Sequence, residues 1–229
     1  MDNGTICCEP RSSQNLKITE VLISAQEKLK EVKYKGSYPT LYDFLNWSLK
    51  NSENIMKDIS VINSIDNRVI LARKLFEIYI SVKVTRENTK LGLEKEKLVP
   101  KFIRSSNKRL DIRKLCADLN VNKDIYPFYS YFAHPYTYSK MRKNDGLDIS
   151  TSHMLYHIND YEYQVEELNQ LILIYVVEDL IKDINYIVKR LLSPSDKDLI
   201  DCYVINKDMV NNEIEKSLEK LNKRIEKKK

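Results

Sequence analysis

The chain has 229 residues, which is long enough to bury a hydrophobic core without disulfide or metal support. Only 4 glycines and 6 prolines accompany 42% hydrophobic residues, so there is little material for the frequent tight turns of an all-β protein. The formal net charge is +5, and its distribution along the chain is more informative than its total. The composition predicts an all-α protein, a single helical bundle of about six to eight helices.

Several classes of protein are excluded by missing signals. The 4 cysteines are scattered without a CxxC pair, and the first residues lack the basic and apolar regions of a signal peptide, so we expect reduced thiols and a cytoplasmic protein. The longest apolar run, Leu171 to Val177, is far shorter than the roughly 20 residues of a membrane-spanning helix, and we expect it to be buried core. No GxxxxGK[ST], GxGxxG or GxSxG motif occurs, which argues against nucleotide triphosphatases, Rossmann enzymes and α/β-hydrolases. No cofactor is predicted.

Apolar residues at three- and four-residue steps predict the helices of the first half. We expect a flexible leader over 1–13, a first helix over 14–34 and a second from Thr40, whose Trp47 should anchor the core. The clearest helix of this half covers Val61 to Arg86. The stretch 88–106 loses the period and contains Pro100, so we expect an exposed connector there, followed by a short helix over 110–119.

The second half contains the longest apolar stripe. Pro135 predicts a break near His134, because proline removes a backbone donor and clashes with the preceding turn. A long helix is expected over about 161–192 and ends at Ser193-Pro194-Ser195. The bundle domain is therefore assigned to 14–206, and 207–229 to an amphipathic, basic C-terminal helix. Docking of this helix on the bundle is favoured over pairing with a second chain as a homodimer.

Positive charge is concentrated in one segment. Residues 83–114 hold eleven Lys/Arg against four Asp/Glu, a pattern that attracts an acidic partner or nucleic acid. The residues predicted to bind it are the following cations: Lys101, Arg104, Lys108, Arg109 and Arg113. The alternative, a solvated connector, is favoured because Phe102 is the only aromatic residue among these charges.

The three histidines suggest one metal site. His153 and His157 are four residues apart, which places both on one face of a helix and within reach of one ion. The sequence HMLYH lacks the glutamate of the HExxH pattern, and a third ligand would have to come from His134, Glu162 or another carboxylate. A structural or solvent-exposed histidine pair is therefore preferred, and no metal is assigned.

A second set of candidates combines an ion pair with an aromatic cluster. Arg73 and Glu77 are four apart on a helix with apolar neighbours, where they form either a buried pair or an ordinary surface pair. His134 lies among tyrosines and could exchange a proton, although a hydrogen-bonded core histidine is the preferred interpretation. The residues predicted to bind a ligand around it are Tyr129, Tyr136, Tyr138 and Ser139.

The segments RKLFEIYI (73–80) and YSYFAHPYTYSK (129–140) resemble a bacterial family of uncharacterised helical proteins related to the HEPN-like bundles of toxin, abortive-infection and phage-defence systems. The likeness covers about residues 60–190. It implies a HEPN-like core in which Arg73, Glu77 and His134 converge on an interhelical cleft as catalytic residues. HEPN ribonucleases carry Arg followed after four to six residues by His, and no histidine of this chain has such an arginine, which favours a non-catalytic or differently catalytic relative.

These patterns lead to three hypotheses. The first is a non-enzymatic interaction protein of a bacterial or phage defence or counter-defence system, which binds a protein or a nucleic acid such as RNA. The second is a HEPN-like ribonuclease or phosphate-acting enzyme that uses Arg73 and His134. The third is a metal-dependent hydrolase that uses His153 and His157.

Overall fold

The computed structural model describes residues 11–32, 39–100, 112–122, 124–133, 152–192 and 207–226, and within these ranges it contains α-helices and no strand. The all-α prediction is therefore confirmed. One five-residue π-helical stretch, Val188–Leu192, extends the longest helix. The α-helices are α1 (Arg11–Glu31), α2 (Pro39–Val61), α3 (Ile65–Lys90), α4 (Lys95–Leu98), α6 (Ile112–Asp118), α7 (Ile125–Ala133), α9 (Ser152–Ile187) and α10 (Lys207–Glu226).

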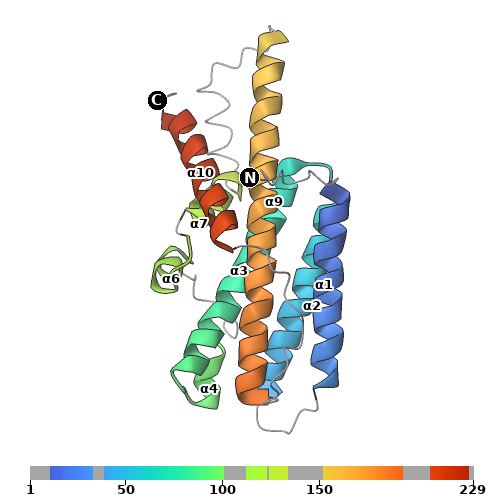
Figure 1. The fold of residues 1–229 in the computed structure, drawn as a ribbon, viewed down its shortest axis with the longest axis vertical. Helices are drawn as coiled ribbons and strands as arrows, with labels where there is room; N and C mark the ends of the chain where they lie inside the picture. The colour runs from blue at the N-terminus through green and yellow to red at the C-terminus, as the bar shows by residue number, and fades with distance from the viewer. Residues whose placement is uncertain are drawn as a thin grey trace, which may run out of the picture.

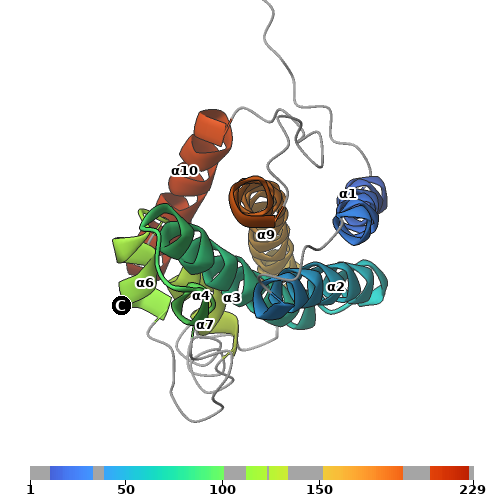
Figure 2. The same ribbon diagram turned by 90° about the horizontal axis from the view of Figure 1, so that it is seen from below.

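Four long helices form the bundle. Helices α1, α2, α3 and α9 pack side by side, α6 and α7 lie against α3, and α10 lies against α9 (Figure 1). Seen along the bundle, α9 occupies the middle, with the other long helices around it (Figure 2). The N-terminal part of α9 extends beyond the ends of its neighbours (Figure 1).

Helix α3 is the most deeply packed element of the first half. Ser64 caps its N-terminus by accepting a hydrogen bond from the backbone N–H of Asn67 at 3.5 Å, and Asp66 complements the helix dipole in the first turn. The helix ends at Leu91, where Gly92 adopts the left-handed φ of 66° that a residue without a Cβ tolerates. Because α2, α7 and α9 all pack against α3, its central turns have little contact with solvent.

Buried hydroxyl groups allow α3 to be enclosed on several sides without losing hydrogen bonds. Ser81 donates to the carbonyl of Glu77 at 2.8 Å, and Thr85 donates to that of Ser81 at 3.0 Å. Thr89 continues the series by donating to the carbonyl of Thr85 at 2.8 Å. Each hydroxyl therefore enters the interior with its donor satisfied, which removes most of the cost of burying it.

The structure also corrects several expectations from the sequence. Helix α1 begins at Arg11, before the expected start, and α9 is continuous from Ser152 instead of beginning near 161. The prediction that Trp47 anchors the core is wrong, because its side chain is 46% exposed. The apolar run 171–177 is core as expected. Within the part of the chain that is described, no helix combines the length and the apolar character that crossing a bilayer requires.

Helix α10 docks on the bundle, in agreement with the prediction. Ile214 and Leu218 are buried and Val210 is half-buried, and the helix packs against α9. The opposite face carries charged residues, among them Lys216, which pairs with Glu213 at 2.8 Å. A single apolar stripe facing α9 and a charged face outward is the arrangement that its amphipathic pattern favours.

Candidate functional site

Arg73 and Glu77 form the ion pair that their spacing predicts. The Nε of Arg73 donates to Oε1 of Glu77 at 3.0 Å, and its Nη2 donates to the hydroxyl of Tyr126 on α7 at 2.8 Å. The guanidinium also lies 5.1 Å from the centre of the Tyr126 ring. The two side chains are 21% and 40% exposed, so the pair lies at the protein surface and not in the core.

The convergence of this pair with His134 stays a prediction. His134 lies outside the described residues, as do Tyr136, Tyr138 and Ser139. Tyr129 is described, and it lies in the core with no exposed surface, where its ring packs 5.8 Å from that of Phe76. Tyr129 therefore packs in the core, and its predicted binding role stays a prediction. Burial raises the pKa of the Tyr129 hydroxyl well above its usual range.

The predicted metal ligands are placed only in part. Positions 153 and 157 both belong to α9, but their side chains lie outside the described residues. Among the residues that are described, no three His, Cys, Asp or Glu side chains gather closely enough to hold a metal ion. Cys116 is buried with a free thiol, and burial raises its pKa to about 11, so the thiol is protonated at neutral pH.

The positive charge counted over 83–114 is largely neutralised where the structure describes it. Lys83 and Arg86 point toward the acidic residues of α9, Lys90 pairs with Glu87 at 2.8 Å, and Lys97 pairs with Glu94 at 2.9 Å. The predicted nucleic-acid contacts lie elsewhere: Lys101, Arg104, Lys108 and Arg109 are outside the described residues, and of Arg113 only the backbone is described. Their role stays a prediction.

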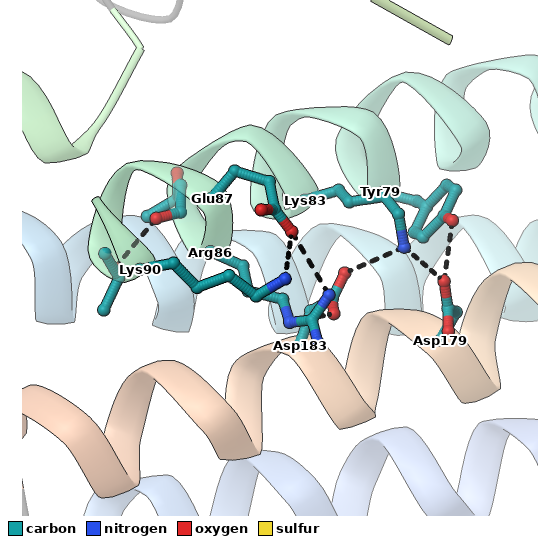
Figure 3. Close-up of polar contacts among 9 residues, drawn as sticks. Tyr79, Lys83, Arg86, Glu87, Lys90, Asp179 and Asp183 are labelled. Carbon is teal, nitrogen blue, oxygen red and sulfur yellow. Dashed lines mark hydrogen bonds and ion pairs between the residues drawn. The ribbon is translucent and has the colours of Figure 1, made fainter. Parts of the chain in front are cut away.

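A buried charge cluster between α3 and α9 is the most unusual group of residues in the described structure. It contains Tyr79, Lys83 and Arg86 from α3 and Asp179 and Asp183 from α9 (Figure 3). The spacing of four and three residues on α3 and of four on α9 places each set on one helical face. The two cations and two carboxylates balance each other, so the cluster, which we call the α3–α9 charge cluster, has no net charge when all four groups are ionised.

Asp179 is the well hydrogen-bonded acid of the α3–α9 charge cluster, although it is buried. Its Oδ2 accepts a hydrogen bond from the Tyr79 hydroxyl at 2.8 Å and another from the ammonium of Lys83 at 2.6 Å. Burial raises the pKa of the Tyr79 hydroxyl well above its usual range, and the nearby Tyr175 and Asp179 raise it further. Tyr79 is therefore a neutral donor at all physiological pH values.

Asp183 is the poorly hydrogen-bonded acid of the cluster. It is only 2% exposed, its Oδ1 lies 3.0 Å from Nε of Arg86, and its Oδ2 lies 3.6 Å from Nζ of Lys83. These are ion pairs by distance, but neither Oδ2 of Asp183 nor Nε of Arg86 makes a hydrogen bond within the described residues. The Lys83 ammonium is too far from Oδ2, and the N–H of Arg86 is poorly directed at Oδ1. The carboxylate thus has charge partners and lacks well-directed donors.

These geometries perturb the pKa values of the cluster. Burial raises the pKa of Asp183 to about 6, and Asp179 raises it too, while Lys83 and Arg86 act in the opposite direction. Burial lowers the pKa of Lys83, but Asp183 and Asp179 raise it by more, so it lies above the ordinary lysine value. Lys83 is therefore a permanent cation, whereas the pKa of Asp183 lies close to the physiological range.

The sequence contains a weak signal for this cluster, which is easily missed beside the apolar stripe of α9. Asp179 and Asp183 come shortly after the run 171–177, and each directly precedes a buried apolar residue, Leu180 or Ile184. Two acids four apart inside an apolar helix require cations from another helix, because a lone buried charge costs several kcal/mol. Lys83 has the same character on α3. Which helix faces which, however, cannot be obtained from either segment alone.

The cluster is closed and not an open catalytic cleft. A hollow between α9 and α10 reaches Asp179 and is lined by Tyr175, Glu178, Asp179, Lys182 and Val210, but it is too narrow to admit a water molecule. Lys182 and Glu178 at its edge pair with each other at 2.6 Å. This arrangement suits a group of residues that holds two helices together, since a substrate has no room beside Asp179.

An exposed aromatic residue marks a different surface. Trp47 stacks on Phe44, with the ring centres 6.2 Å apart, and belongs to a stripe of exposed residues that runs the length of α2. We call this surface the α2 stripe. Its exposed members are Thr40, Asp43, Trp47, Lys50, Asn54, Lys57, Asp58 and Val61.

Comparisons with known proteins add no family. No family model, curated protein or solved structure matches this chain. The candidate sites therefore stand on their own geometry.

Proposed function

We propose that this chain is a helical-bundle interaction protein that binds a protein partner through the α2 stripe, with Trp47 as the anchor. The observation that carries the proposal is the 46% exposure of Trp47, the only tryptophan of the chain. Tryptophan is the residue type most enriched among energetically dominant interface positions, since its ring offers a large contact area at low entropic cost. Val61 extends the apolar part of the stripe and is 76% exposed.

The charges of the α2 stripe support a protein rather than a nucleic acid as the partner. Lys50 and Lys57 both pair with the nearly buried Glu53, at 3.2 and 2.6 Å. The hydrogen bond from Lys57 has the largest effect on Glu53 and, together with Lys50, holds its pKa below the usual value despite its burial. Glu53 therefore stays ionised. Asp43 and Asp58 balance the two lysines of the stripe, and Glu53 beneath them adds a third acid, so phosphate groups would gain little there.

A role in a bacterial or phage defence or counter-defence system belongs to the same proposal. Its support is the resemblance of the segments 73–80 and 129–140 to the HEPN-related helical family. Proteins of such systems act in sets, and the products of the neighbouring genes are therefore the first partners to test.

Trp47 makes the test direct, because its fluorescence reports on its own environment. Each purified product of the two flanking genes, and separately a 20-nucleotide single-stranded RNA, is titrated into the protein while emission and light-scattering mass are recorded. We expect a blue shift and a heavier particle with a protein. Trp47→Ala should weaken that binding about 30-fold, which corresponds to about 2 kcal/mol for an anchoring residue.

Leu91→Ala is the matched control, since Leu91 is an exposed apolar residue at the end of α3. It should leave binding unchanged. Equal affinity of wild type and Trp47→Ala for a bound protein would exclude the α2 stripe as the interface. If RNA produced a response and neither protein did, the partner would be a nucleic acid and not a protein.

A second candidate function is the HEPN-like ribonuclease or phosphate-acting enzyme that uses Arg73 and His134. One observation favours it: the Arg73–Tyr126 hydrogen bond joins α3 to α7, the helix that ends at Ala133 just before His134. The pairing of the guanidinium with Glu77 at 3.0 Å counts against a phosphate role, because a phosphate would have to displace that carboxylate. RNA incubated with the protein distinguishes the two functions, since cleavage lost in both Arg73→Ala and His134→Ala would establish the enzyme.

A further inference from the structure

Asp183 and Asp179 are both buried aspartates and both face Lys83, but their hydrogen bonding differs. Asp179 accepts two well-formed hydrogen bonds, whereas Oδ2 of Asp183 accepts none within the described residues. Two carboxylates one helical turn apart also repel each other, and a proton on either relieves the repulsion. Because Asp179 would lose two strong hydrogen bonds on protonation, the proton is better placed on Asp183.

The groups that surround Asp183 and would respond to its protonation come from α3 and α9. Helix α3 contributes Tyr79, Lys83, Arg86 and Glu87, and α9 contributes Asp179 and Tyr186. Glu178 and Lys182 lie farther out on α9 and pair with each other. In the described structure, the charged groups with the largest effect on the pKa of Asp183 are Lys83, Asp179 and Arg86.

Arg86 is the group that can move. Its side chain is 28% exposed, in contrast to the buried Lys83, and it already has a second partner in Glu87, with Nη1 3.3 Å from Oε1. Its guanidinium lies 5.2 Å from the centre of the Tyr186 ring, so it reaches across to α9 by two contacts, one ionic and one aromatic. When Asp183 is neutral, the ionic contact to α9 is lost and the contact to Glu87 within α3 remains.

We propose that the α3–α9 charge cluster is a proton-operated latch, in which uptake of one proton from solvent by Asp183 releases the Arg86 guanidinium from α9 to Glu87. The proton binds the unsatisfied Oδ2 of Asp183, and the cluster changes from no net charge to one positive charge. Lys83 stays on Asp179 and keeps the helices together, so the latch loosens the end of the α3–α9 contact without separating it.

The test uses the full-length protein and two NMR signals. The side-chain carboxyl ¹³C resonance of Asp183, assigned by its absence in Asp183→Asn, should titrate with a midpoint about two units above that of an ordinary aspartate, a hundredfold gain in proton affinity. The Nε–H resonance of Arg86 should shift with the same midpoint. In Asp183→Asn, which resembles the protonated acid, the Arg86 signal should already hold its low-pH position at pH 7.5 and should not titrate.

Asp118→Asn is the control, because Asp118 is an exposed acid at the end of α6, outside the cluster. It should leave both titrations as in the wild type. An ordinary midpoint for Asp183, near that of a solvent-exposed aspartate, overturns the proposal. So does an Arg86 signal that stays constant while Asp183 titrates, since the carboxyl would then take up its proton without releasing the guanidinium.

Discussion

Replacement of Lys83 by methionine is the most direct test of the α3–α9 charge cluster. The substitution keeps the length and apolar stem of the side chain and removes the ammonium, which lies 2.6 Å from Asp179 and 3.6 Å from Asp183. Breaking a buried ion pair on one side typically costs about 3–5 kcal/mol, because the remaining charge stays buried without compensation. Here two carboxylates are left with Arg86 and Tyr79 alone, so we expect a loss of unfolding free energy in this range at pH 7.5.

The pH dependence of that loss carries more information than its size. Lys83 lowers the pKa of Asp183, so its removal raises that pKa further and makes the folded state bind protons more readily than the unfolded state. When a carboxyl has a higher pKa in the folded state, stability increases as the pH falls through that pKa. The gap between the wild type and Lys83→Met should therefore narrow as the pH is lowered from 7.5 to 5.

Urea unfolding followed by circular dichroism measures both effects. Lys97→Met is the matched control, because Lys97 pairs with Glu94 at 2.9 Å on an exposed surface, where such a pair contributes at most about 1 kcal/mol. A loss for Lys83→Met no larger than that of Lys97→Met would show that the buried pair does not hold α3 to α9. A large loss that is the same at both pH values would refute the electrostatic explanation and leave only packing.

Three further outcomes are expected. Asp183→Asn should be more stable than the wild type at pH 7.5, by up to about 3 kcal/mol, because the pKa of Asp183 is raised to about 6 and its ionisation in the folded state is unfavourable. In urea unfolding the difference in stability should disappear toward pH 4, and a variant less stable than the wild type at pH 7.5 would contradict this. Tyr129→Phe should change the unfolding free energy by less than about 1 kcal/mol, since the buried hydroxyl makes no hydrogen bond within the described residues and its removal leaves no partner unsatisfied. A melting temperature lowered by more than about 5 °C would contradict this and indicate a hydrogen-bond partner for the hydroxyl. Metal analysis and a melt with and without EDTA test His153 and His157: the preferred interpretation, a structural pair, predicts no stoichiometric metal and identical melts, whereas a metal whose removal lowers the melt would establish a site.

The helices were predictable because their buried faces are periodic. In α3 the core residues Val69, Leu75, Phe76 and Tyr79 recur at helical spacing, and the same holds for Ile172, Val176 and Leu180 in α9. Trp47 shows where this reasoning fails. The buried stripe of α2 passes through Leu45, Leu49 and Met56, so position 47 lies on the opposite face, and the size of the ring misled the prediction.

The charge cluster shows a different limit. Charges counted over 83–114 include Lys83 and Arg86, yet both are compensated by residues of α9 that lie about a hundred positions away in the sequence. Segment counts describe a chain whose charges all face solvent, and they lose meaning where a helix turns its cations inward. The Arg73–Glu77 pair was predictable because both partners belong to one helix, whereas its contact with Tyr126 depends on how α7 packs.

The cross-helix ion pairs also explain why α3 and α9 adopt one register. Arg68 near the beginning of α3 pairs with Glu166 in the middle part of α9 at 2.6 Å, and Arg86 near the end of α3 pairs with Asp183 near the end of α9. The pairs ascend together, so the two helices run parallel, and the residue separation between the two pairs agrees to within one position on α3 and α9. A slip by one turn, about 5.4 Å, would preserve most apolar contacts but would separate all of these buried charges from their partners at once. The apolar stripes therefore bring the helices together, while the charges select the one alignment in which every buried carboxylate meets a cation.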